Sequence, residues 1–220
     1  MITEKNIPKP LTNLHMEKEN FNLLTFGVTF LYEEYYTYPN KIENFTESRT
    51  FISLPMISSS GKASKINSDI LNTYEILMKK YKANDRAELK FKFINDCEKC
   101  IGKFKAKTLE EDFGFLHTEI CSIMLSLDQI KKFNEMQSEK LGKHLKSTLM
   151  KHIIITLHSW HQPCEEDDKG CMPFLKQSIE NPLFKTKIKE SLKTCQTDSM
   201  KFSLVITRID KNSIINEINK

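Results

Sequence analysis

The run HIIITLH at residues 152–158 constrains the fold of this chain more than any other feature. Three consecutive isoleucines followed by Thr156 and Leu157 show no alternation between an apolar and a polar face. β-branched side chains favour strands, because they pack well on a pleated surface. The run therefore predicts a strand that is buried on both of its faces.

Apolar residues at helical spacing predict three helices on the N-terminal side of this strand. The first covers 19–36, where the apolar positions are Phe21, Leu24, Val28, Leu31 and Tyr35. The second covers about 65–83 and has Ser64 as its N-cap, and the third covers about 110–136. A weaker helix is predicted at 183–194.

Alternating patterns predict the other strands. A short apolar segment at 49–57 carries Pro55, which is typical of an edge strand. In 88–94 and 101–107, Phe and Ala alternate with Lys, and the link NDCEKC between these segments is typical of a turn, so an antiparallel hairpin is predicted at 88–107. A last strand is predicted at 202–209, whereas the acidic segment after Trp160 is typical of a loop.

The bulk composition predicts one folded domain. Hydrophobic residues make up 39% and charged residues 28% of the 220, which excludes global disorder. No apolar run is long enough to span a membrane, and the first residues lack the apolar core of a signal peptide. We expect a flexible N-terminal arm at 1–17, a single domain at 18–220, and thiols at all six cysteines.

No catalytic pattern is apparent in the sequence. The chain has no phosphate-binding glycine motif and no nucleophile elbow. Cys97 and Cys100 form a CxxC pair, but the predicted hairpin turn is the wrong context for a redox site. The sequence therefore predicts a protein that is not an enzyme and has no cofactor.

A metal site is the alternative for one group of residues. Two imidazoles and two thiols lie close together in the sequence, and zinc prefers such ligands. Their spacings match no common zinc module, so we expect a loop without metal. The candidates for this site are His158, His161, Cys164 and Cys171.

Three stretches carry a resemblance to a known family. They are LLTFGVTFLYEEYYTYP, ILNTYEILMKKY, and the series CIGKFKAKT, HTEICSIMLSLDQI and HIIITLHSWHQP, which together span about 20–165. In order and character these segments resemble the HORMA-domain family, in particular its meiotic chromosome-axis members. The resemblance implies three helices packed on an antiparallel sheet, with a core at 18–160 and a C-terminal safety belt at 161–220.

The function that this resemblance implies is peptide capture in the nucleus, at the axis of meiotic chromosomes. A closure-motif peptide, from a partner protein or from another copy, adds a strand and is locked by the belt. The resemblance also implies an AAA+ remodelling ATPase as a partner and possible association with chromatin, with no membrane. The residues expected to contact the peptide are Ile153, Ile155, Leu157, Trp160, Leu204 and Ile206.

Other functions stay open from the sequence alone. Spindle-checkpoint and DNA-repair adaptors of the same family are short, as this chain is. A nucleic-acid-binding module could use the lysine-rich hairpin at 88–107, because rows of lysine contact phosphates. A metal-dependent enzyme built on the cluster from His158 to Cys171 is the third alternative.

Overall fold

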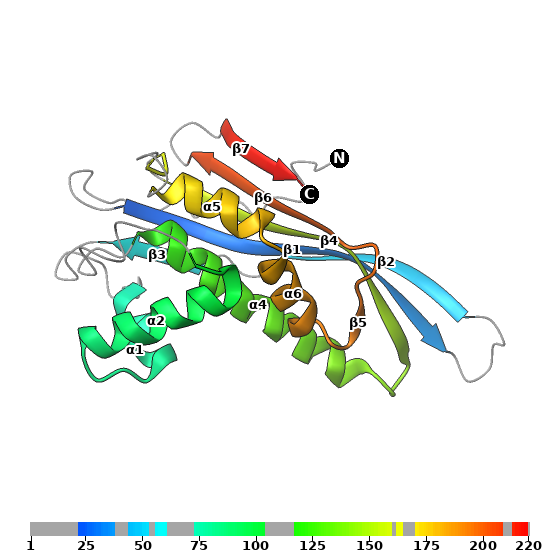
Figure 1. The fold of residues 1–220 in the computed structure, drawn as a ribbon. Helices are drawn as coiled ribbons and strands as arrows, with labels where there is room; N and C mark the ends of the chain where they lie inside the picture. Colours follow the sequence, from blue (N-terminus) through cyan, green and yellow to red (C-terminus); the bar gives the residue numbers. More distant parts are fainter. Residues whose placement is uncertain are drawn as a thin grey trace.

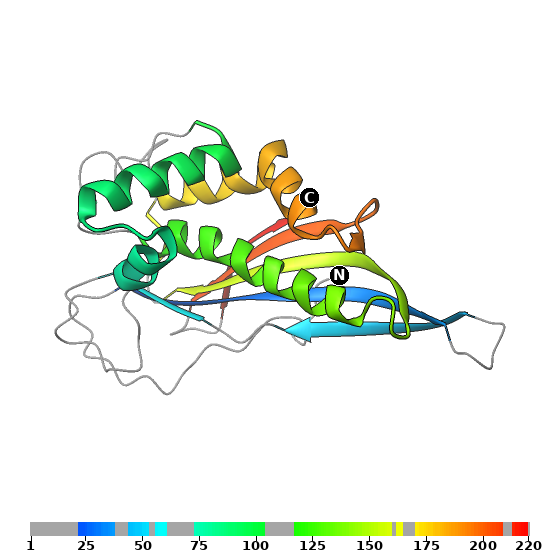
Figure 2. The ribbon, with the colours of Figure 1, turned by 90° about the horizontal axis from the view of Figure 1, so that it is seen from below.

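The computed structural model describes residues 22–37, 44–52, 56–60, 73–103, 117–159, 162–164, 170–208 and 213–219. Within these residues the protein has the predicted α+β class, with five helices and one seven-stranded sheet. The helices lie on one side of the sheet (Figure 1), and Figure 2 shows the same layering from a second direction.

The sheet is mixed rather than antiparallel. Its strands are β1 (Asn22–Thr37), β2 (Asn44–Ile52), β3 (Met56–Ser60), β4 (Leu145–Ser159), β5 (Cys195–Gln196), β6 (Lys201–Arg208) and β7 (Ser213–Asn219). The order is β2-β1-β4-β6-β7, and β3 pairs with β1 and β5 with β4. β5 and β6 run parallel to β4, because the chain returns to the sheet through two helices and not through a tight turn.

The helices are α1 (Thr73–Tyr81), α2 (Arg86–Ile101), α4 (Thr118–Lys140), α5 (Cys171–Glu180) and α6 (Pro182–Ser191). The helices predicted at 65–83, 110–136 and 183–194 are confirmed by α1, α4 and α6 where the structure describes them. Residues 65–72 and 110–116 lie outside the described residues. α5 and β7 occupy segments for which the sequence predicted no helix or strand.

The helix predicted at 19–36 is wrong, because this segment forms strand β1. Its apolar residues fit two periods at once. The alternating residues Leu24, Phe26, Val28 and Phe30 are all buried on the face that packs against α4, and Thr25 and Thr29 are buried on the opposite face. A strand between β2 or β3 on one side and β4 on the other buries both faces, and its many aromatic and β-branched residues favour that outcome.

The hairpin predicted at 88–107 is also wrong, since residues 86–101 form helix α2. The helical period was present in Leu89, Phe93 and Cys97, which are fully buried, whereas Phe91 is 68% exposed. Asp85 caps the helix by accepting a hydrogen bond from the backbone N–H of Glu88, and Glu88 in turn accepts one from the backbone of Asn84. The remaining residues of the predicted second strand, from 104 on, lie outside the described part.

The core does not stop at residue 160. Cys171, Phe174, Leu175 and Ile179 on α5, Phe184 and Ile188 on α6, and Phe202, Leu204 and Ile206 on β6 belong to the same buried cluster as β1 and α4. The segment predicted to be a belt is therefore, where described, an integral part of the packed domain. None of the helices in the described residues is long and apolar enough to cross a membrane.

Candidate metal centre

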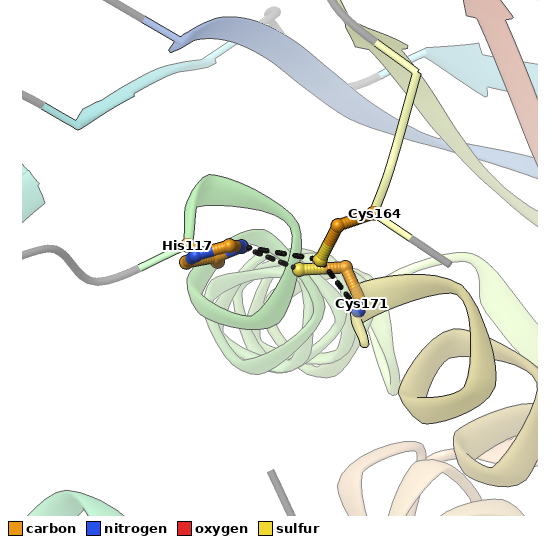
Figure 3. A group of neighbouring side chains, drawn as sticks. All are labelled: His117, Cys164 and Cys171. Carbon is orange, nitrogen blue, oxygen red and sulfur yellow. Dashed lines mark hydrogen bonds between the residues drawn. The ribbon is translucent and has the colours of Figure 1, made fainter. Parts of the chain in front are cut away.

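Three side chains from separate parts of the chain meet where α4 and α5 begin. His117 occupies the N-cap position of α4, Cys171 is the first residue of α5, and Cys164 lies between β4 and α5. Figure 3 shows the His117 ring facing both sulfur atoms. The three ligand atoms lie within 4.8 Å of one another, which makes the cluster a candidate metal centre.

Cys164 caps the N-terminus of α5. Its Sγ accepts a hydrogen bond from the backbone N–H of Cys171 at 3.1 Å, and its carbonyl oxygen accepts one from the backbone N–H of Met172 at 3.0 Å. These are two of the N–H groups that a helix leaves without an internal partner at its start. The positive end of the α5 dipole therefore lies beside this sulfur and favours its thiolate form.

The two thiols have opposite pKa shifts. Hydrogen bonds from Cys171 and from His117 lower the pKa of Cys164 to about 4. The pKa of Cys171 is raised far above its usual range, first by its hydrogen bond with Cys164, then by burial and by the charge of Glu119. Of the two sulfurs, Cys164 is thus the one that carries the negative charge.

The donor set fits zinc, and so does one of its two nitrogen–sulfur distances. Zn–S bonds of about 2.3 Å and Zn–N bonds of about 2.0–2.1 Å at tetrahedral angles place a nitrogen and a sulfur ligand about 3.6 Å apart. His117 Nδ1 lies 3.6 Å from Cys164 Sγ and 2.9 Å from Cys171 Sγ. The first distance matches the expectation, whereas the second is the shorter distance of a hydrogen bond and would have to lengthen for both side chains to bind one zinc ion.

A buried carboxylate lies beside the centre. Glu119, in the first turn of α4, is 1% exposed and forms a hydrogen bond with Cys171. The hydroxyl of Thr118 donates a second hydrogen bond to Glu119 Oε2 at 3.2 Å. A carboxylate is almost never fully buried unless it is paired, and Cys171 is one of the partners of Glu119, so this carboxylate adjoins the candidate site.

The structure unites half of the residues that the sequence offered as metal ligands. Cys164 and Cys171 come together, but their imidazole partner is His117. His158 lies on β4, where its ring is hydrogen-bonded to the hydroxyl of Thr207. His161 lies outside the described residues.

The residues predicted to contact a peptide are core residues in this structure. Ile153, Ile155, Leu157, Leu204 and Ile206 are all 0% exposed. β4 and β6 pair directly from His152↔Lys201 to Ser159↔Arg208, so no peptide strand lies between them. Trp160 lies outside the described residues.

The lysine-rich segment and the CxxC pair lie on a helix and not in the predicted hairpin. Lys90 and Lys92 lie on helix α2, and Lys92 donates hydrogen bonds to the carbonyls of Tyr81 and Lys82. The strand face proposed for nucleic-acid contact is therefore absent from the described part of 88–107. Cys97 and Cys100 are buried in α2, and burial raises the pKa of both, which leaves them unreactive thiols.

The sequence contained a signal that pointed to the centre. His117-Thr118-Glu119 has the form H-x-E. Pro163 and Cys164 have the form P-C, and the next cysteine in the sequence is Cys171. In zinc-dependent nucleobase deaminases, H-x-E and P-C-x-x-C supply the ligands and the catalytic glutamate. The ligands predicted from the sequence are close neighbours along the chain, whereas His117 is 47 residues away from Cys164.

Comparisons with known proteins add no relative. No family model, no curated protein and no solved structure matches the chain.

Proposed function

We propose that this protein is a zinc-dependent hydrolase of amidine groups, which deaminates a nucleobase. The observation that carries the proposal is the buried carboxylate of Glu119 beside the triangle of His117, Cys164 and Cys171. A zinc ion that only holds a fold together needs ligands, but it does not need a buried proton carrier next to them. This proposal replaces the expectation from sequence that the protein is not an enzyme.

The ligand set divides the roles among the residues. His117, Cys164 and Cys171 would hold the metal, and the described residues supply three ligands, which is the number that catalytic zinc sites take from the protein. Zinc held by one histidine and two cysteines activates water for attack on C4 of cytosine or C6 of adenine.

Glu119 would move the protons. Hydrolysis forms a carbon–oxygen bond from water, breaks the bond to the exocyclic nitrogen, and releases ammonia. A carboxylate beside the centre would accept a proton from the attacking water and deliver it to the ring nitrogen, and it would then pass the proton of the newly added hydroxyl to the departing amine, which leaves as ammonia. The fold supports this role because α4 begins directly after His117 and places Glu119 within hydrogen-bonding reach of Cys171.

One feature of the chain departs from the deaminase pattern. Six residues separate Cys164 from Cys171, whereas the pattern has two. The second cysteine nevertheless starts helix α5, and both sulfurs lie close to His117. The spacing therefore lengthens the connection without moving the ligands apart.

The test begins with metal analysis of the purified protein and of three variants. We expect one zinc per chain in the parent protein and in Glu119→Gln, and loss of zinc in Cys171→Ser. His161→Ala should keep its zinc, because three ligands are already present without it. Loss of zinc in Glu119→Gln would instead make Glu119 a ligand and remove its catalytic role.

Activity is then measured as ammonia release from cytidine, deoxycytidine, adenosine and single-stranded oligonucleotides. Glu119→Gln should lower the rate by about 10²- to 10⁴-fold, the usual contribution of a general acid–base group. Glu135→Gln, an exposed position on the same helix, is the matched control and should keep full activity. A zinc-loaded parent protein that releases no ammonia from any of these substrates would refute the proposal.

Peptide capture by a HORMA-like adaptor in the nucleus remains a second proposal. The observation in its favour is that the chain after β4 returns to the sheet and lays β6 along β4. One of the segments that carried the resemblance, described at 22–37, forms strand β1, whereas the resemblance implied a helix. A pull-down with peptide mapping tests it: a single short peptide that dissociates over hours supports capture, and the absence of any such peptide contradicts it.

A further inference from the structure

Ser159 is a buried polar residue that lacks a hydrogen-bond partner among the described residues. It is the last residue of β4, it is 0% exposed, and its hydroxyl has no partner within the ranges that the structure describes. Nearly all buried polar groups in proteins are satisfied, so each exception requires a physical reason. A group whose partner arrives only with a ligand is one such reason.

Ser159 lies on the face of the sheet that carries the helices. Side chains alternate along a strand, and Ile153, Ile155 and Leu157 belong to the core cluster under α4, whereas Ile154 does not. Position 159 continues the series 153, 155, 157. Its neighbour in register on β1 is Leu24, which is also in that cluster.

Ser159 also lies level with the metal centre. α4 and β4 run antiparallel and are joined by a hydrogen bond between Thr148 and Gln137. From Gln137 back to His117 the helix rises about 30 Å, at 1.5 Å per residue. From Thr148 forward to Ser159 the strand rises about 36 Å, at 3.3 Å per residue. The hydroxyl is therefore at the same end of the α4–β4 layer as His117.

A second landmark agrees with this placement. Phe133 on α4 stacks on Phe30, with ring centroids 4.1 Å apart, and Phe30 is in register with Ile153. From Phe133 the helix rises about 24 Å to His117, and from Ile153 the strand rises about 20 Å to Ser159. Counted from Thr148, Ser159 lies slightly beyond the level of His117, and counted from Ile153 it lies slightly before that level. The two counts therefore place Ser159 close to the level of the metal centre.

We propose that Ser159 is a substrate-binding residue of this site, whose hydroxyl forms a hydrogen bond with the polar edge of the bound nucleobase. The inference rests on the proposed function and adds a specificity-determining residue to it. A serine hydroxyl both donates and accepts, so it can pair with a ring carbonyl or with an amino group. A buried hydroxyl that stays unpaired without substrate lowers the stability of the free protein, and a ligand that forms a hydrogen bond with it therefore binds more tightly.

The chain supplies a matched control on the same strand. Thr156 is also 0% exposed and its hydroxyl also has no hydrogen-bond partner in the described part of the chain, but the residue faces the opposite side of the sheet. Thr156→Val removes an unpaired hydroxyl of the same kind away from the centre. Ser159→Ala removes the one that is level with it.

The experiment measures folding stability and nucleoside binding for both variants. Binding of cytidine and of adenosine is measured by calorimetry with zinc-loaded protein that carries Glu119→Gln, so that the ligand is not converted. We expect Ser159→Ala to raise the dissociation constant by about 3- to 10-fold, the usual effect of losing one hydrogen bond. The melting temperature of this variant should stay equal or rise. Thr156→Val should leave binding unchanged.

The outcomes separate the two proposals. Binding by the parent that Ser159→Ala leaves unchanged overturns the inference about Ser159 and leaves the proposed function in place. A lower melting temperature of Ser159→Ala also overturns it, because the hydroxyl then stabilises the free protein. Absence of nucleoside binding by the zinc-loaded parent overturns the proposed function and this inference with it.

Discussion

Phe133 provides a direct test of the strand at 22–37, which sequence periodicity predicted to be a helix. Its ring stacks on Phe30 at 4.1 Å between centroids and meets the edge of Tyr32 at 5.1 Å. Residues two apart face the same side on a strand, whereas on a helix they point to different sides. Only the strand therefore lets one α4 side chain touch both.

The perturbation is a pair of double-mutant cycles, Phe133→Leu with Phe30→Leu and Phe133→Leu with Tyr32→Leu. Each aromatic pair contributes about 0.5–1.5 kcal/mol beyond the area that it buries. We expect a coupling energy in that range for both cycles, measured from denaturant unfolding curves. Leucine preserves much of the buried volume, so each single variant should remain folded.

A third cycle supplies the control. Leu31 lies between the two aromatic residues on β1 and points to the other side of the strand. Phe133→Leu with Leu31→Ala should show no coupling beyond about 0.3–0.5 kcal/mol, the usual additivity error. Coupling of Phe133 to only one of Phe30 and Tyr32, or equal coupling to Leu31, would refute the strand assignment.

Two further predictions follow from the electrostatics. In the metal-free protein Cys164 should be alkylated by iodoacetamide at a rate that hardly falls between pH 8 and pH 6, because its pKa of about 4 keeps it a thiolate there, whereas Cys97, with a raised pKa, should react only after unfolding; a rate for Cys164 that falls tenfold per pH unit would contradict this. Lys140→Met should lower the free energy of unfolding by about 1–3 kcal/mol, since it removes the cation that pairs with the fully buried carboxylate of Glu34. The control Lys151→Met, at a more exposed ion pair, should lower it by under about 1 kcal/mol. Equal losses for the two variants would show that burial of Glu34 does not matter.

The sequence alone determined the elements whose pattern admits one period. The isoleucine run of β4 has no polar face, and its β-branched residues disfavour a helix, so strand is the only outcome. α4 was predicted because its apolar residues recur at three and four over many turns. The α+β class follows from these two elements, and it is confirmed.

Only the tertiary structure decided the elements whose sequences fit two periods. Leu24 and Val28 lie four apart, as on one helix face, and an even number apart, as on one strand face. Pairing with β4 settles the question, because it satisfies the backbone groups of β1 and buries both of its faces. In α2, Phe91 and Phe93 alternate with lysines as in a strand, but the buried positions are those spaced by four.

The metal centre was decided by the tertiary structure for a different reason, which is the distance between its ligands along the chain. His117 and Cys164 are 47 residues apart, and no local preference brings them together. The antiparallel run of α4 beside β4 returns the chain to the level of His117, and both sulfurs lie against its ring, that of Cys171 at the start of α5. The sequence contained the ligands, but their proximity depends on two similar lengths, the about 30 Å of helix from Gln137 back to His117 and the about 36 Å of strand from Thr148 forward to Ser159.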